Sequence, residues 1–177
     1  MDQHYVPALR FGWATRFYDV IINIFMRAKR LRDLSVATLE ISNPSVILEA
    51  GCGTGSLTIP LAEKYRSANI VAVDIDAQIL AVARSKAIKS NNIIFRQASV
   101  TDRDGMANAV AAPVDAAISS LVFHHLTTDG KRAALENIAA ALEDGGELHI
   151  IDWGPPKGIV ASLGFWFVRL LDGMAVT

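Results

Sequence analysis

Cysteine is almost absent from this chain, which contains one among its 177 residues. A single cysteine excludes an intrachain disulfide and fits a reducing compartment, so we expect a cytoplasmic protein. An excess of charge of one sign is also lacking, since the formal net charge is −1 and no tract of lysine or arginine occurs. We therefore expect no nucleic-acid partner.

Long apolar runs of membrane-spanning character are lacking as well. The start of the chain has no apolar stretch typical of a signal peptide, and the apolar segment 158–174 is short for a bilayer and interrupted by Arg169 and Asp172. No membrane span is therefore expected. With 51% hydrophobic and 20% charged residues, the composition is that of a globular protein, and the length predicts one domain.

The stretch that organises the chain is residues 46–55, which read VILEAGCGTG. A short apolar run stopped by glycines predicts a buried strand followed by a tight turn, and the apolar spacing after it predicts a helix over residues 56–65. Glycines have no Cβ, so a ligand can lie against bare backbone beside the unpaired N–H groups of a helix start.

The glycine pattern is not that of the two commonest phosphate-binding loops. The third glycine of the dinucleotide fingerprint is missing, and no Lys-Ser or Lys-Thr pair follows as in a P-loop. A purely structural turn remains an alternative at this point. A second apolar run, residues 69–74, ends in Asp74, where a βαβ unit places a carboxylate that can accept hydrogen bonds from both ribose hydroxyls. Ile75 can cover one face of an adenine.

With these two anchors, the chain resembles the class I S-adenosylmethionine-dependent methyltransferases. Residues 49–55 resemble their first motif, and residues 72–83 resemble their second. Residues 114–126 resemble the fourth strand with its following turn, and residues 143–152 resemble the segment that closes the core. Within the family, the His-His-Leu at 124–126 and the Asp-Trp at 152–153 look most similar to small-molecule methyltransferases of the quinone-biosynthesis type.

The resemblance implies a three-layer, doubly wound, Rossmann-like α/β fold with a mainly parallel sheet of strand order 3-2-1-4-5. It implies S-adenosyl-L-methionine as cofactor, S-adenosyl-L-homocysteine as product and a small-molecule methyl acceptor. The residues it assigns to the cofactor are Glu49, Gly51, Cys52, Gly53, Gly55, Asp74, Ile75, Ser99, Val100, Ser119 and Leu121. Ser99 departs from the family, in which an acid commonly reaches the adenine amino group.

Further elements follow from periodicity and turn residues. We expect a helix over 77–90 with Ile88 facing inward, and strands over 93–98 and 114–119. Another helix is capped by Thr127 or Thr128, includes Leu142 and is stopped by Gly145-Gly146, before a strand over 147–152.

The two ends of the chain are expected to flank a core of residues 43–156. Residues 1–42 predict a helical lid, in which Phe17 and Tyr18 are candidates for substrate or cofactor contacts, because aromatic faces attract a sulfonium cation. Residues 157–177 predict an apolar helix, and the family's closing C-terminal hairpin is missing, so we expect a truncated end. The uncovered apolar surface favours a homo-oligomer.

Catalysis of methyl transfer needs alignment and exclusion of water, and a base only when the acceptor arrives protonated. His124 and His125 follow the fourth strand and are the candidate catalytic residues, with packing or hydrogen bonding as the alternative. No metal site is expected, because the ligand spacing is missing. Two alternatives to a methyltransferase remain: a catalytically silent adenosylmethionine-binding fragment or regulatory subunit, and an NAD-dependent oxidoreductase.

Overall fold

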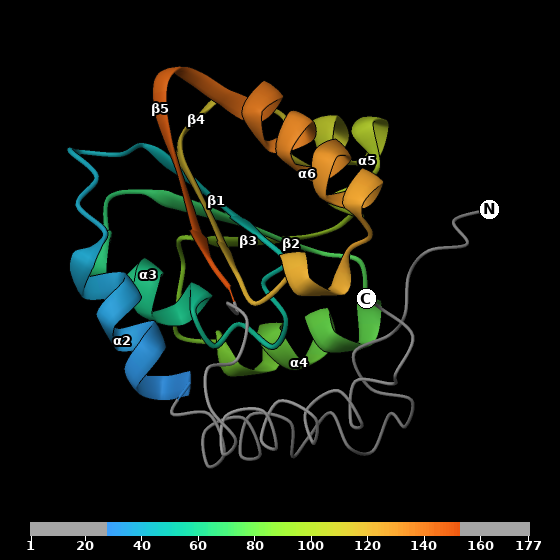
Figure 1. Cartoon of the computed structure of the whole chain (residues 1–177). Coiled ribbons are helices and arrows are strands. Elements are labelled where there is room, and N and C mark those ends of the chain that lie inside the picture. Colours follow the sequence, from blue (N-terminus) through green and yellow to red (C-terminus); the bar gives the residue numbers. More distant parts are fainter. Residues whose placement is uncertain (1–27, 153–177) are drawn as a thin grey trace, which may run out of the picture.

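A parallel sheet of five strands forms the centre of the computed structural model, which describes residues 28–152 (Figure 1). The strand order is β3-β2-β1-β4-β5, as predicted. The strands are β1 (Val46–Ala50), β2 (Asn69–Asp74), β3 (Ile93–Gln97), β4 (Val114–Ser120) and β5 (Leu142–Ile151). The helices are α2 (Ala28–Thr38), α3 (Thr58–Lys64), α4 (Ala77–Lys86), α5 (Arg103–Ala109) and α6 (Thr128–Ala141), with a 3-10 turn η1 (Phe123–His125).

Both faces of the sheet are covered, which gives the predicted three-layer fold. Figure 1 shows α5 and α6 on one side of the sheet and α2 and α3 on the other. Successive side chains of β1 point to opposite faces of the sheet. Ile47 packs in the core cluster with α2 and α3, whereas Leu48 packs in the cluster with α5 and α6. Burial on both faces explains why β1 and β2 read as continuous apolar runs.

The connection between α6 and β5 differs from the prediction. Thr127 caps α6 as expected, but the helix ends at Ala141, and Leu142 already belongs to β5. Gly145 and Gly146 therefore do not stop the helix; they lie within a register shift at the start of β5, where Gly145 has φ +86°. Glycine adopts this backbone conformation readily, so the pair accommodates a bulge in the strand.

Two helix predictions also need correction, and one helix was missed. Helix α4 ends at Lys86, so Ile88 lies beyond it and is 82% exposed instead of facing inward. Helix α3 is shorter than predicted and begins at Thr58, with Pro60 in its first turn as expected. Helix α5 was not predicted at all, because its short sequence contains Gly105 and offers Met106 as its buried residue.

A hollow of about 440 Å³ lies between α2 and β5. Its lining includes Leu34 and Ile150, which are 53% and 44% exposed. Within residues 28–152, β5 pairs with β4 and with no other strand, so its outer edge is open. None of the helices in this range is long and apolar enough to cross a bilayer.

The open edge of β5 supports a prediction of self-association through this strand and residues 159–177, which lie outside the described residues. Light scattering of the isolated chain at roughly tens of micromolar should report oligomers or aggregates, in the concentration range where exposed apolar surface associates. Ile150→Lys should reduce them, whereas Ile88→Lys, at an exposed position on the far side of the sheet from β5, should not. A monodisperse monomer of the unaltered chain would contradict the prediction.

Candidate functional site

The loop after β1 is tied to the end of β2 by backbone hydrogen bonds. The amides of Gly51 and Cys52 both donate to the Val73 carbonyl, at 2.8 and 2.9 Å. Gly51, Gly53 and Gly55 have φ values of +81°, +53° and +76°, a region that side chains with a Cβ rarely adopt. The backbone conformation of the loop therefore requires these glycines, whether or not a ligand is bound.

Each of the three glycines faces a different environment. A Cβ at Gly51 would lie 2.2 Å from Cγ2 of Val122, in the turn after β4. A Cβ at Gly55 would lie 3.3 Å from Cβ of Ala83 on α4. At Gly53 a Cβ would meet nothing within 4 Å. Gly51 and Gly55 thus allow close packing, whereas Gly53 borders open space that a ligand can occupy.

Asp74, at the end of β2, holds the same loop through its carboxylate. Oδ2 accepts a hydrogen bond from the Gly53 amide at 2.8 Å, and Oδ1 accepts one from the Asp76 amide at 3.0 Å. Burial raises the pKa of Asp74, and these two amide bonds act in the opposite direction. Each carboxylate oxygen can accept more than one hydrogen bond, so the predicted ribose contact remains available.

Glu49 lies beneath the loop and is 1% exposed. Among the described residues, its Oε2 atom and the hydroxyl of Thr58 on α3 have no hydrogen-bond partner. Burial raises the pKa of Glu49 to about 8, the nearby Thr58 hydroxyl lowers it, and the negative charge of Asp74 raises it further. A buried carboxyl oxygen without a hydrogen-bond partner is uncommon in a folded protein, so Oε2 of Glu49 is a candidate for contact with a ligand.

The other residues predicted to bind the cofactor lie near the carboxyl ends of the strands. Ser119 is buried on β4, and its hydroxyl donates to the Ala50 carbonyl at 2.9 Å. Leu121 has φ +59°, and its amide donates to the Ile151 carbonyl at 2.8 Å. Val100 is buried in the core. Ile75, directly after β2, is partly exposed.

Two of the predicted contact residues are already engaged within the protein. The Ser99 hydroxyl lies 2.8 Å from the Thr101 hydroxyl and accepts a hydrogen bond from the Thr101 amide at 3.3 Å. Burial raises the pKa of the Cys52 thiol well above its usual range, so this side chain stays protonated and packs in the core. Phe17 and Tyr18, the predicted lid residues, lie outside the described residues.

Of the two histidines predicted as catalytic, His124 is hydrogen-bonded to Asp152, and the ring of His125 lies against the ring of His124. Nδ1 of His124 lies 2.7 Å from Oδ1 of Asp152, and the His124 amide donates to Oδ2 at 3.1 Å. The ring centroids of His124 and His125 are 4.0 Å apart. Burial and the neighbouring His124 lower the pKa of His125 to about 4, and Asp152 opposes this shift. His125 is therefore uncharged near neutral pH.

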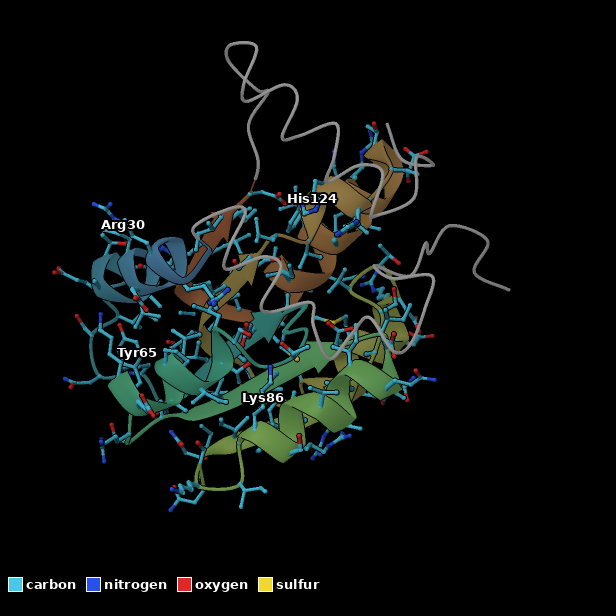
Figure 2. The ribbon with its side chains drawn as sticks, turned by 90° about the horizontal axis from the view of Figure 1, so that it is seen from below. Arg30, Tyr65, Lys86 and His124 are labelled. Carbon is cyan, nitrogen blue, oxygen red and sulfur yellow. The ribbon has the colours of Figure 1, made fainter. Side chains whose placement is uncertain are left out.

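Figure 2 shows His124 close to the end of β5, where Asp152 follows the strand. Val122, two residues before His124, packs against Gly51, so this histidine belongs to the same edge of the sheet as the glycine loop. Sequence reasoning placed Val122 and Asp152 within family motifs, but it predicted neither the contact of Val122 with Gly51 nor the pairing of Asp152 with His124. Within residues 28–152, no group of three or more His, Cys, Asp or Glu side chains is placed to hold a metal ion.

Comparisons with known proteins agree on the class. Residues 47–146, more than half of the chain, match the family described as "Methyltransferase domain". An uncharacterized methyltransferase of Bacillus cereus is 29% identical over 106 residues, which are 60% of this chain and 46% of that protein. An uncharacterized protein of Synechococcus is 38% identical over 107 residues, which are 59% of this chain and 24% of that protein. The chain thus spans less than half the length of either relative.

Solved structures share the fold at low sequence identity. DhpI in complex with SAH has a TM-score of 0.66 and 22% identity, over 81% of this chain and 66% of that one. Coclaurine N-methyltransferase bound to N-methylheliamine and SAH has a TM-score of 0.59 and 21% identity, over 68% and 34% of the two chains. The predicted fold is therefore confirmed. By its family match, this chain belongs to the methyltransferase domain family, as the resemblance in its sequence predicts.

Proposed function

We propose that this chain binds S-adenosylmethionine and transfers its methyl group to a small-molecule acceptor. The observation that carries the proposal is the open space at Gly53, bordered by a carboxylate that is hydrogen-bonded to the same glycine. This loop lies at the carboxyl ends of β1 and β4, between which the strand order reverses, and doubly wound sheets bind their ligands at that point. DhpI has been solved with SAH and with SAM, which supports the same cofactor here.

The residues of this loop fit the cofactor by size and by chemistry. Gly53 leaves room for the bound molecule, Asp74 offers acceptor atoms to the ribose hydroxyls, and Ile75 offers an apolar surface to the adenine. Glu49 supplies a buried carboxyl at the end of β1, just before the loop, and its Oε2 atom is open to a hydrogen bond from the ligand. The cofactor itself supplies a methyl group already activated on a sulfonium, so the protein has to orient the acceptor and exclude water.

Two finer statements belong to the same proposal. A cytoplasmic location is supported by the single cysteine, and a quinone-biosynthesis type of acceptor is supported by the motif resemblance alone. A catalytically silent binding module is the alternative, and the match to a methyltransferase family does not favour it. Cofactor binding without methyl transfer to any acceptor in a broad panel would favour it. The match to a methyltransferase family does not favour an NAD-dependent oxidoreductase.

Asp74→Ala should weaken binding of S-adenosylhomocysteine, measured by calorimetry, by roughly 1–3 kcal/mol, because charge-assisted hydrogen bonds to the ribose are lost. Asp76→Ala is the matched control, because this neighbour caps α4 through the Gln78 and Ile79 amides and is not proposed to touch the ligand. If the two variants lose affinity equally, Asp74 acts only by shaping the loop. Unchanged affinity in Asp74→Ala would place the cofactor elsewhere.

A further inference from the structure

The hydrogen-bonded pair formed by Asp152 and His124 is not among the residues proposed to bind the cofactor. The carboxylate makes two contacts to one residue, with Nδ1 of the ring at 2.7 Å and with the backbone amide at 3.1 Å. A carboxylate oxygen only accepts hydrogen bonds, so this contact fixes the proton of a neutral imidazole on Nδ1. The other ring nitrogen, Nε2, then has a lone pair with which it can accept a proton.

Backbone contacts hold this pair in place. The Leu121 amide donates to the Ile151 carbonyl at 2.8 Å and so fixes the turn after β4 against the residue before Asp152. Leu121 has φ +59°, a conformation that costs free energy in a residue other than glycine and is retained where the surrounding contacts require it. Val122 links the same turn to Gly51 of the cofactor loop. These contacts hold the pair in place and join its turn to the loop that we propose binds the methyl donor.

His125 is less suited to accept a proton. Burial and the adjacent His124 lower its pKa to about 4, so a proton transferred to it would be held weakly at neutral pH. Among the titratable groups of residues 28–152, Asp152 and His125 are those that contact the His124 side chain. The sequence offers both histidines as bases, whereas the structure favours His124, which is hydrogen-bonded to a carboxylate, over His125, whose pKa is lowered.

We propose that Asp152 is a positioning residue that holds His124 as a general base, and that the methyl acceptor is a hydroxyl group of a small molecule. This inference rests on the proposed methyltransferase function. An acceptor that is already a neutral amine needs no base, and a thiol ionises near neutral pH, whereas a phenol has a pKa of about 10. A site with a positioned base is therefore suited to a hydroxyl acceptor, which must lose its proton.

The proposed step balances without a further reagent. A lone pair of the acceptor oxygen forms the new O–CH3 bond, and the S–CH3 bond of the sulfonium breaks with its electrons remaining on sulfur. The hydroxyl proton passes to Nε2 of His124, while Asp152 stabilises the imidazolium through Nδ1. The products are a methyl ether and the neutral thioether form of the cofactor.

The first test needs no acceptor. Long-range ¹H–¹⁵N spectra of the 177-residue chain, assigned with His124→Gln, should show the Nδ1-protonated tautomer at His124. Asp152→Asn should disturb this tautomer preference, and Asp152→Glu should restore it at least in part. His149→Gln is the matched control, because His149 forms a similar pair with Glu147 on β5, with Nε2 and Oε2 3.0 Å apart. An Nε2-protonated tautomer in the unaltered chain would overturn the positioning role.

The second test uses S-adenosylmethionine with phenol and thiophenol as probes, and detects the product by mass spectrometry. We expect transfer to the phenol oxygen, a fall in kcat of roughly 10²–10⁴-fold in His124→Gln with a smaller change in KM, and a fall of at least about tenfold in Asp152→Asn. Methylation of thiophenol or of ring carbon alone, or no transfer to phenol, would overturn the inference. Calorimetry with S-adenosylhomocysteine separates this failure from failure of the proposed function, which would show no cofactor binding.

Discussion

Gly53→Val is expected to abolish detectable binding of S-adenosylmethionine and S-adenosylhomocysteine. The loop needs φ +53° at this position, and a β-branched side chain would strain it. A Cβ at Gly53 meets no protein atom within 4 Å, so the isopropyl group would project into the space assigned to the ligand. A loss of at least roughly a hundredfold in affinity, on the order of 3 kcal/mol, should be measured by calorimetry.

Gly145→Val is the matched control for this experiment. Gly145 also has a positive φ, +86°, and a Cβ there also meets nothing within 4 Å. It lies in the bulge at the start of β5, at the other end of the strand from Asp152. Both variants should lose stability to backbone strain, and only Gly53→Val should lose binding. Equal binding by the two variants would mean that the glycine loop is a structural turn and no more.

The buried carboxyl of Glu49 should make the folding stability fall as the pH rises from about 4.5 to about 8. Its pKa is raised from 4.5 to about 8 in the folded protein, mainly by burial, and returns to its ordinary value when the chain unfolds. Between these two values the folded state binds the extra proton, so the contribution is complete at low pH and is lost as the pH passes through about 8. The expected change is on the order of a few kcal/mol.

The test compares urea unfolding at pH 5 and at pH 8 for the unaltered chain and for Glu49→Gln. An amide does not titrate, so the difference between the two pH values should shrink in the variant, even though its buried NH2 group lowers the overall stability. Glu63→Gln, at an exposed position on α3, controls for the loss of one charge. If Glu49→Gln and the unaltered chain show the same pH dependence, Glu49 does not retain its proton in the folded state.

The sheet and the glycine loop could be predicted from the sequence because their signals are local. Strands buried on both faces are continuous apolar runs, as in β1 and β2, and backbone with positive φ demands glycine at residues 51, 53 and 55. The order of the strands followed from alternating strands and helices together with the family resemblance. These features could be predicted without knowing which residues far apart in the sequence are in contact.

Features that depend on tertiary contacts were missed. The pairing of His124 with Asp152 joins residues 28 positions apart and depends on the register of β4 and β5, which no local pattern encodes. Helix α5 forms although its sequence has few apolar residues, because Met106 and Val110 complete a core cluster. Ile88 was assigned to the interior by periodicity, but the helix had already ended before it. Tertiary packing overrode local preference in each case.

Because Gly51 and Val122 are in contact, a substitution at one of these positions is tolerated only with a matching substitution at the other. Any side chain at position 51 would place its Cβ 2.2 Å from a methyl carbon of Val122, so a change there requires a smaller partner at 122 and a new path for the loop backbone. A change at 122 alone alters the fit of the turn that leads to His124. A mutational library that randomises one position while holding the other will therefore find few functional variants, whereas one that varies both together samples the compensated pairs.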